Sequence, residues 1–143
     1  MIRQLRRNSN GSVAVETAIF TPIFLVMMLG TTDLGTGMFV RMQVNAAVQA
    51  GATYAVLNSS NPVCTTLTPT CLNGIKQAMN DASGNPSFCT SAVCTATIGG
   101  CADGSPKCII VTATYPYTPI LPDAVYTWAS AQNYSSTVTV RIQ

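Results

Sequence analysis

Residues 13–40 read VAVETAIFTPIFLVMMLGTTDLGTGMFV, and this stretch decides how the chain is organised. Its only charged residues before Arg41 are Glu16 and Asp33, and its centre, residues 18–29, is almost wholly apolar. As an α-helix its 28 residues would extend for about 42 Å, which exceeds the roughly 30 Å of a hydrocarbon core. We therefore expect a helix that crosses a membrane.

The residues before this stretch indicate an orientation. Residues 1–11 contain Arg3, Arg6 and Arg7 and no acidic residue. The positive-inside rule therefore places residues 1–11 in the cytoplasm and everything after about residue 40 outside it. A cleaved secretory signal is the alternative, but its apolar part is about 7–15 residues long. Here the apolar run is longer and continues into a helical pattern, which favours a retained anchor in the inner membrane, with the head in the periplasm.

Composition excludes several classes of protein. The chain of 143 residues has seven basic and five acidic residues, about 8% charged, where soluble domains carry roughly 25%. It contains no histidine, which removes the commonest general base and the commonest zinc ligand. Basic residues beyond the anchor are few and well separated, which argues against nucleic-acid binding. We therefore expect that the protein is not an enzyme and that it binds no cofactor, no metal ion and no small-molecule substrate.

A second helical segment follows directly on the anchor. Ala47, Gly51 and Ala55 lie four residues apart on one face, which lets another helix approach closely. That helix belongs either to the chain's own head or to another copy. Residues 58–62, NSSNP, are expected to end this helical segment. If none of its glycines interrupts it, a helix over residues 13–57 would be about 68 Å long.

The remaining residues predict a small α+β head. Residues 72–82 have the apolar spacing of a short amphipathic helix, and residues 99–107, GGCADGSPK, have the composition of a hairpin loop. Prolines in residues 115–122 require an extended segment outside a sheet interior. Three stretches have the pattern of antiparallel strands, namely residues 93–98, 108–115 and 135–142.

The fold class is thus α+β, with a long amino-terminal transmembrane helix followed by a small antiparallel β-sheet head with a short helix and disulfides. The expected parts are a basic leader over residues 1–11, the transmembrane and extended helix over residues 12–57, and an extracytoplasmic head over residues 58–143.

All of the cysteines lie beyond the anchor, at Cys64, Cys71, Cys89, Cys94, Cys101 and Cys108. Six cysteines in a small head of few charges indicate disulfides, each stabilising by about 2–4 kcal/mol. Zinc is disfavoured because there is no CxxC and no histidine. Fifteen pairings are possible. Cys101 with Cys108 is the favoured pair, followed by the local pairs Cys64–Cys71 and Cys89–Cys94.

A short motif stands where the basic leader meets the apolar run. Arg6-Arg7-Asn8-Ser9-Asn10-Gly11 is followed by Ser12-Val13-Ala14-Val15-Glu16. This resembles the type IV prepilin signal, in which a membrane peptidase cuts after a glycine and leaves glutamate as the fifth mature residue. The resemblance implies cleavage between Gly11 and Ser12.

Physical chemistry gives Glu16 a role of its own. A carboxylate one turn into a membrane helix costs on the order of 3 kcal/mol unless it is paired. The new α-amino group of a neighbouring subunit is an available cation, and the helix dipole also favours an acid there. Alternatively, the Glu16 side chain reaches the headgroups and has no assembly role.

A longer signature resembles TadE-like proteins, which are pseudopilins or minor pilins of the tight adherence (Tad, or Flp) pilus. It includes Ala14-Val-Glu-Thr-Ala through Pro22, Leu29-Gly30, Asp33 with Gly35, Val40-Arg41 and the Ala/Gly-rich residues 45–55. Residues 115–122, YPYTPILP, are similar to a later element of the same family. The major Flp pilin is much shorter and has tyrosine after the glutamate, where this chain has Thr17 and a sizeable head. These differences favour a minor component.

The functional hypothesis is a membrane-anchored minor pilin whose partners are the prepilin peptidase, other pilin subunits and the pilus assembly platform. Asp33 lies near the outer edge of the expected membrane span. It either pairs with a partner subunit or the platform, or it merely marks the membrane interface. The alternative function is a signal-anchored envelope adhesin or binding module without pilus processing.

Overall fold

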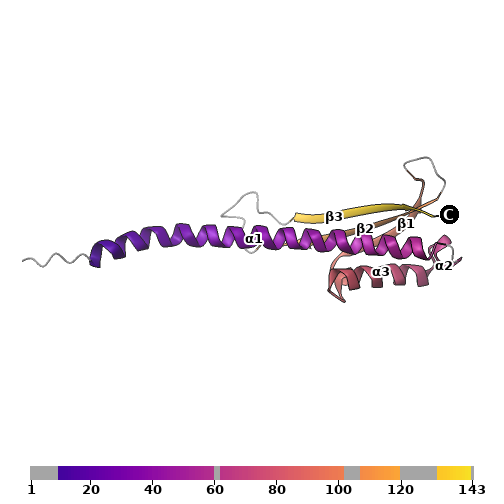
Figure 1. Cartoon of the computed structure of the whole chain (residues 1–143), viewed down its shortest axis with the longest axis horizontal. Helices are drawn as coiled ribbons and strands as arrows, with labels where there is room; N and C mark the ends of the chain where they lie inside the picture. Colours follow the sequence, from indigo (N-terminus) through magenta and orange to yellow (C-terminus); the bar gives the residue numbers. More distant parts are fainter. Residues whose placement is uncertain (1–9, 60–61, 102–106, 120–131, 143) are drawn as a thin grey trace, which may run out of the picture.

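Figure 1 shows one long helix with a small head along its second half. The computed structural model describes residues 10–59, 62–101, 107–119 and 132–142. The helices are α1 (Asn10–Leu57), α2 (Pro62–Thr65), α3 (Pro69–Ser83) and α4 (Phe88–Ser91). The strands are β1 (Val93–Gly99), β2 (Cys108–Tyr117) and β3 (Gln132–Arg141). Arg3, Arg6 and Arg7, the middle of the expected hairpin loop and residues 120–122 of the proline-rich segment lie outside the described residues.

The first helix is continuous, so none of its glycines interrupts it. α1 has 48 residues and is about 72 Å long, and it begins three residues before the predicted start. Pro22 lies inside it, where it cannot donate the usual backbone hydrogen bond. On its amino-terminal side, the hydroxyls of Thr17 and Thr21 donate to the carbonyl oxygens of Val13 and Thr17.

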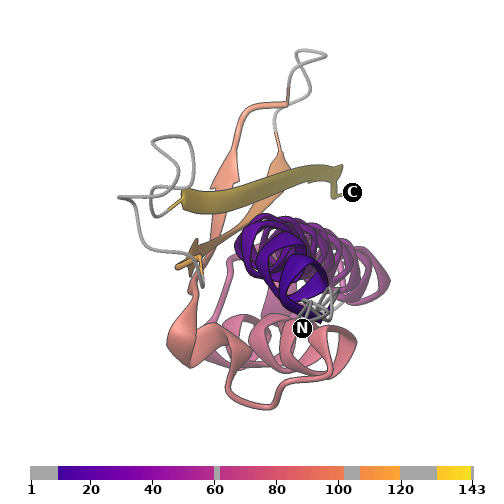
Figure 2. The same ribbon diagram turned by 90° about the vertical axis from the view of Figure 1, so that its left-hand side faces the viewer.

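A stripe of buried residues runs along the second half of α1. It begins at Asp33 and continues at intervals of three or four residues through Gly37, Val44, Ala47, Val48, Gly51, Ala52 and Ala55. This is the spacing of one helix face. Figure 2, which looks along α1 from its amino-terminal end, shows α1 lying between α3 on one side and the sheet on the other. The core of the head therefore includes the anchor helix itself.

The small residues of α1 serve the chain's own head. A Cβ atom on Gly51 would lie 2.7 Å from Cγ of Met79 and 3.2 Å from Cγ2 of Ile75, both on α3. Ala47 and Ala55 are fully buried in the same core. Of the two alternatives that the sequence left open, the structure thus supports close packing of α1 on its own domain.

The bounds of α3 follow from its caps. Thr68 caps the first turn, with its hydroxyl 3.5 Å from the amide nitrogen of Cys71, and Pro69 occupies the first helical position. Gly84 ends the helix with a φ of 68°, a left-handed conformation that favours glycine. The predicted helix over residues 72–82 lies within α3 and missed the first turn, because its periodicity begins only at Leu72.

The three strands form one antiparallel sheet in the order β1-β2-β3. All three were predicted, although β2 extends to Tyr117 and β3 begins earlier, at Gln132. β2 is central, yet it contains Pro116. The pairing with β1 ends at Thr114, so Pro116 is paired only with Asn133 of β3. A strand position that is paired on one side only can accept a proline, which has no backbone N–H. The proline-rich segment can therefore begin within the sheet.

The two faces of the sheet differ in chemistry. Ile109, Val111 and Ala113 of β2 are fully buried against α1. On the opposite face, Thr112 is hydrogen bonded to Thr137 at 3.0 Å and Thr114 donates to Ser135 at 3.2 Å. This alternation of inward apolar and outward hydroxyl side chains sets the register of the sheet.

All six cysteines are paired, and the three predicted pairs are confirmed. Cys64–Cys71 joins α2 to α3, Cys89–Cys94 joins α4 to β1, and Cys101–Cys108 closes the β1–β2 hairpin. Because every cysteine sulfur is in a disulfide, no cysteine thiolate remains to bind zinc.

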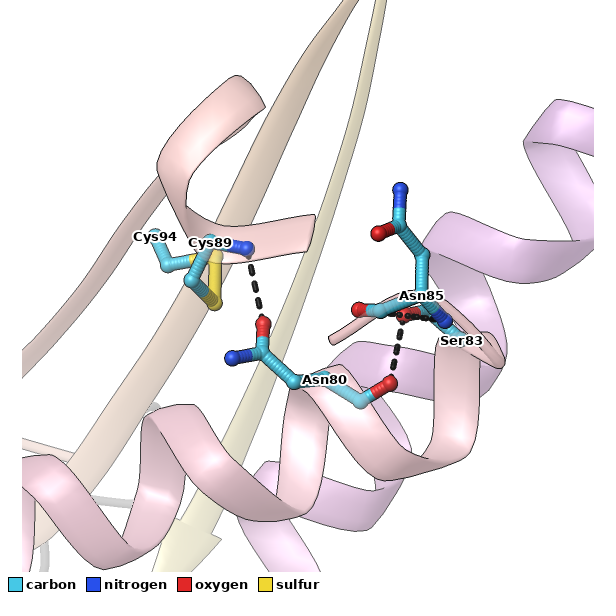
Figure 3. The surroundings of a disulfide bond; sticks show 5 residues. All are labelled: Asn80, Ser83, Asn85, Cys89 and Cys94. Atoms are coloured by element: carbon cyan, nitrogen blue, oxygen red, sulfur yellow. Dashed lines mark hydrogen bonds between the residues drawn. A yellow bond between two sulfur atoms is a disulfide. The ribbon is translucent and has the colours of Figure 1, made fainter. Parts of the chain in front are cut away.

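A small polar network supports the second of these bonds. Figure 3 shows the side chain of Asn80, on α3, accepting a hydrogen bond from the amide of Cys89 at 2.8 Å. The hydroxyl of Ser83 donates to the carbonyl oxygen of Asn80, also at 2.8 Å. The side chain of Gln43 on α1 donates to the carbonyl oxygen of Ser83. These bonds attach the turn between α3 and α4 to the anchor helix.

Burial predicts the order in which the disulfides are reduced. Cys64 and Cys71 are each 1% exposed, whereas Cys89, Cys94 and Cys101 are half-buried. Since a reductant must reach a sulfur atom, Cys64–Cys71 should be the last bond reduced by dithiothreitol in the folded protein. Timed alkylation followed by peptide mass spectrometry measures the order, with urea-unfolded protein as the control. Early loss of Cys64–Cys71 in the folded protein would contradict the packing described here.

Candidate functional site

The environment of α1 changes at Asp33. From Val13 to Thr32 the side chains are exposed, apart from a half-buried Gly30, and these 20 residues extend for about 30 Å. The most apolar window of the helix has a mean hydropathy of 2.0 and none of it is buried. This length matches the hydrocarbon core of a bilayer. The sheet begins to cover one face of α1 at Asp33, nearer to the amino terminus than the expected boundary at about residue 40.

The polar side chains of the exposed half are hydrogen bonded within the helix. Thr31 and Thr32 donate to the carbonyl oxygens of Met27 and Met28, and Thr17 and Thr21 likewise donate to carbonyl oxygens four residues earlier. A hydroxyl that bonds to its own helix needs no partner in lipid, where an unsatisfied polar group is costly. The threonines therefore do not prevent Val13–Thr32 from crossing a membrane.

The predicted processing residues lie at the start of this helix. Gly11 and Ser12 are in the first turns of α1, and Glu16 follows about one turn later with an exposed side chain. Within residues 10–59 and the described head, no ion-pair partner contacts Glu16. Glu16 and Asp33 are 17 residues apart on one helix, about 25 Å, so they form two separate sites.

Asp33 is held by the far end of the sheet. Its side chain is 8% exposed, and the hydroxyl of Tyr117 donates to its Oδ1 at 2.6 Å. The same Tyr117 oxygen lies 3.0 Å from the carbonyl oxygen of Asp33 and 2.8 Å from the hydroxyl of Thr36. Thr36 in turn donates to the Asp33 carbonyl oxygen at 2.9 Å. We call Asp33, Thr36 and Tyr117 the boundary cluster.

Aromatic rings complete this region. The rings of Tyr117 and Tyr134 lie 5.6 Å apart at an angle of 46°. A Cβ atom on Gly37 would lie only 3.0 Å from the hydroxyl oxygen of Tyr134 and 3.7 Å from Cε1 of Tyr117. Gly37 therefore allows the ends of β2 and β3 to approach α1 closely. Tyrosine is a residue that membrane interfaces favour.

The cluster affects the ionisation of Tyr117. Burial and then the hydrogen bond to Asp33 raise the pKa of Tyr117 above its ordinary value of 10.0, although the hydrogen bond with Thr36 lowers it. The folded protein therefore holds the phenolic proton more tightly than the unfolded chain does.

The boundary cluster joins two segments that sequence reasoning treated separately. Asp33 belongs to the first part of the family-like signature and Tyr117 to the second, 84 residues later. No local sequence pattern marks Thr36, Gly37 or Tyr134 as members of a site. The alternation Tyr115-Pro116-Tyr117 at a strand end was the available signal, because alternate residues of a strand share a face.

Together, the exposed apolar half of α1 and the disulfide-bonded α+β head built on its second half define a membrane-anchored protein. Residues 11–53 of the sequence match the family model of TadE-like proteins. The match begins at Gly11 and includes Glu16, Asp33, Ala47 and Gly51. Comparisons with curated proteins and with solved structures found no match.

Removal of one hydroxyl tests the boundary cluster. Tyr117→Phe removes the hydroxyl that donates to Oδ1 of Asp33, and a hydrogen bond to a charged group contributes about 1.5–3 kcal/mol. Tyr134→Phe is the matched control, because among the described residues the Tyr134 hydroxyl makes no hydrogen bond. Denaturant unfolding in detergent should show a lower free energy of unfolding for Tyr117→Phe alone. Equal stability of the two variants would show that the bond contributes nothing.

The same comparison has a pH dependence. The pKa of Tyr117 is raised in the folded state, so the protonated Tyr117 hydroxyl stabilises the fold fully below pH about 10, the pKa in the unfolded chain. This stabilisation is lost as the pH rises through the higher pKa of the folded state. The difference between wild type and Tyr117→Phe should therefore narrow in that alkaline range.

Proposed function

We propose that the protein is a minor pilin of a Tad pilus, trimmed between Gly11 and Ser12 and anchored in the inner membrane by Val13–Thr32. The match to the TadE-like family, which begins at the glycine of the processing motif, carries this proposal. The exposed apolar half of α1 supports it, because a helix of this length and polarity serves either in a membrane or among other helices. The role is association rather than chemistry.

The proposed orientation has the amino terminus in the cytoplasm and the head in the periplasm. Arg3, Arg6 and Arg7 support it through the positive-inside rule. The pairing of all six cysteines also supports it, because structural disulfides persist in oxidising compartments such as the periplasm.

The two acidic residues of the anchor helix have different proposed roles. Cleavage after Gly11 would place Glu16 one turn from a new α-amino terminus, with an exposed carboxylate that can meet the corresponding amine of a neighbouring subunit. Asp33 is hydrogen bonded within its own chain, so it acts in assembly as a positioning residue. It holds the end of the sheet against the helix at the membrane boundary. The other pilin subunits and the assembly platform would then contact a rigid head.

The test is the amino terminus of the protein purified from host membranes. Intact mass and amino-terminal sequencing should show a start at Ser12 in cells with the prepilin peptidase and at Met1 in cells without it. A start at Met1 in both would refute processing and favour an uncleaved envelope adhesin. A cut near residues 30–40 would indicate a secreted disulfide-bonded domain.

Glu16→Ala separates processing from assembly. Cleavage at Gly11 should persist, whereas the amount recovered in sheared pili should fall roughly tenfold or more, because a carboxylate paired in an apolar environment is lost. Thr17→Ala, at the next exposed position, is the control and should behave as wild type. Quantitative immunoblotting of sheared pili and membranes measures both. Wild-type recovery of Glu16→Ala would mean that Glu16 only reaches the headgroups.

A further inference from the structure

The sheet has two strands at its edges, and the described residues offer no further strand to either of them. β3 is the longer, with ten residues paired to β2 in continuous register. Proteins usually protect such an edge with prolines, bulges or charges. β3 contains no proline and its only charge is Arg141, at its end.

A groove lies beside this edge at the end of the head remote from Asp33. Val56 and Leu57 of α1 line one side, and Val138 and Val140 of β3 line the other. The cavity is about 370 Å³ in volume, and none of its lining residues is charged. Val56 is 42% exposed and Leu57 74% exposed, so apolar surface remains open there. We call this the β3 groove.

The opposite edge of the sheet carries an apolar side chain at the matching height. Ile98 of β1 is 41% exposed, although it pairs with the fully buried Ile109. Ile109 pairs in turn with Val140 of β3. Ile98 and Val140 therefore occupy one row across the sheet on the face toward α1, with the groove at one end of the row and Ile98 at the other.

The strand directions restrict how two copies can meet. β1 and β3 are both antiparallel to β2, so they run parallel to each other. β3 also runs alongside α1 (Figure 1). Copies anchored in one membrane have their α1 helices pointing the same way, which excludes antiparallel pairing of β3 with β3. Parallel pairing of β1 from one copy with β3 of the next is allowed. At equal height it brings Ile98 of the second copy to the β3 groove.

We propose that the edge of β1 and Ile98 of one copy dock on the edge of β3 and the β3 groove of another. This proposal rests on the common orientation in the membrane that the proposed function supplies. The two surfaces differ, so the contact is head-to-tail and can repeat from copy to copy. Backbone hydrogen bonds along the strands give affinity, and Ile98 in its groove gives the register.

Photo-crosslinking in host membranes tests the contact. p-Benzoylphenylalanine at Leu57 of the full chain should yield, after irradiation and reduction, an adduct with twice the mass of the subunit. Mass spectrometry should find the attachment in the tryptic peptide that contains Ile98. A self-adduct attached elsewhere, an adduct only with another protein, or no adduct overturns the proposal.

A charge exchange tests the register. Ile98→Lys and Leu57→Glu should each lower the yield of dimer by roughly tenfold or more, because each leaves a charge against an apolar surface. Copurification of two differently tagged copies from detergent-solubilised membranes reports this yield. Coexpression of the two variants, or the double variant, should restore the yield through the new ion pair. Val93→Lys, on the same strand but pointing to the other face and 65% exposed, is the control and should leave the yield unchanged.

Two outcomes separate this proposal from the proposed function. Peptidase-dependent cleavage at Gly11 without the Leu57–Ile98 adduct overturns the docking mode alone. The mass of each variant, measured without reduction, should show that its three disulfides are intact and that the head is folded. Loss of the dimer in such a folded variant supports the contact. Loss of yield that coexpression does not restore counts against it.

Discussion

The packing of the head on both sides of α1 from Asp33 onward determines the rest of the structure. Val44, Val48 and Ala52 of the helix are core residues, and α1 packs against both α3 and the sheet. The same helix leaves the 20 residues Val13–Thr32 exposed, apart from the half-buried Gly30. One continuous helix thus links two environments, and the orientation of the head follows that of the anchor because no loop separates them.

The boundary cluster lies where these environments meet. A carboxylate next to a membrane is costly unless it is hydrogen bonded, and Asp33 meets that requirement within its own chain through Tyr117. The cluster connects the end of the sheet to α1 about 30 Å from the start of the apolar segment. It therefore fixes the distance between the apolar segment and the end of the sheet that contacts Asp33.

Sequence alone predicted the helices and strands well and their ends less well. The apolar run, the Thr-rich alternation of residues 135–142 and the hairpin cysteines are local patterns, and local patterns dictate secondary structure. The extension of β2 through Pro116 was missed because it depends on where β1 ends. The packing partner of Gly51 was left open because the spacing of small residues does not say which helix approaches.

The candidate site was predicted only in part for the same reason. Asp33 stood out as a charge at the end of an apolar run. Its partner lies 84 residues away, and a hydrogen bond over that distance depends on the fold rather than on any local pattern. Glu16 was recognised from a motif, and the partner proposed for it belongs to a neighbouring chain.

The three disulfides each join cysteines only five or seven residues apart. If the head crosses the membrane from its amino-terminal side, each pair emerges nearly together. Each bond can then form before the following elements have arrived, without waiting for distant parts of the chain. The disulfides would then form in the order in which the pairs emerge. Because each partner is close in the sequence, the chance of a wrong pairing with another cysteine is small.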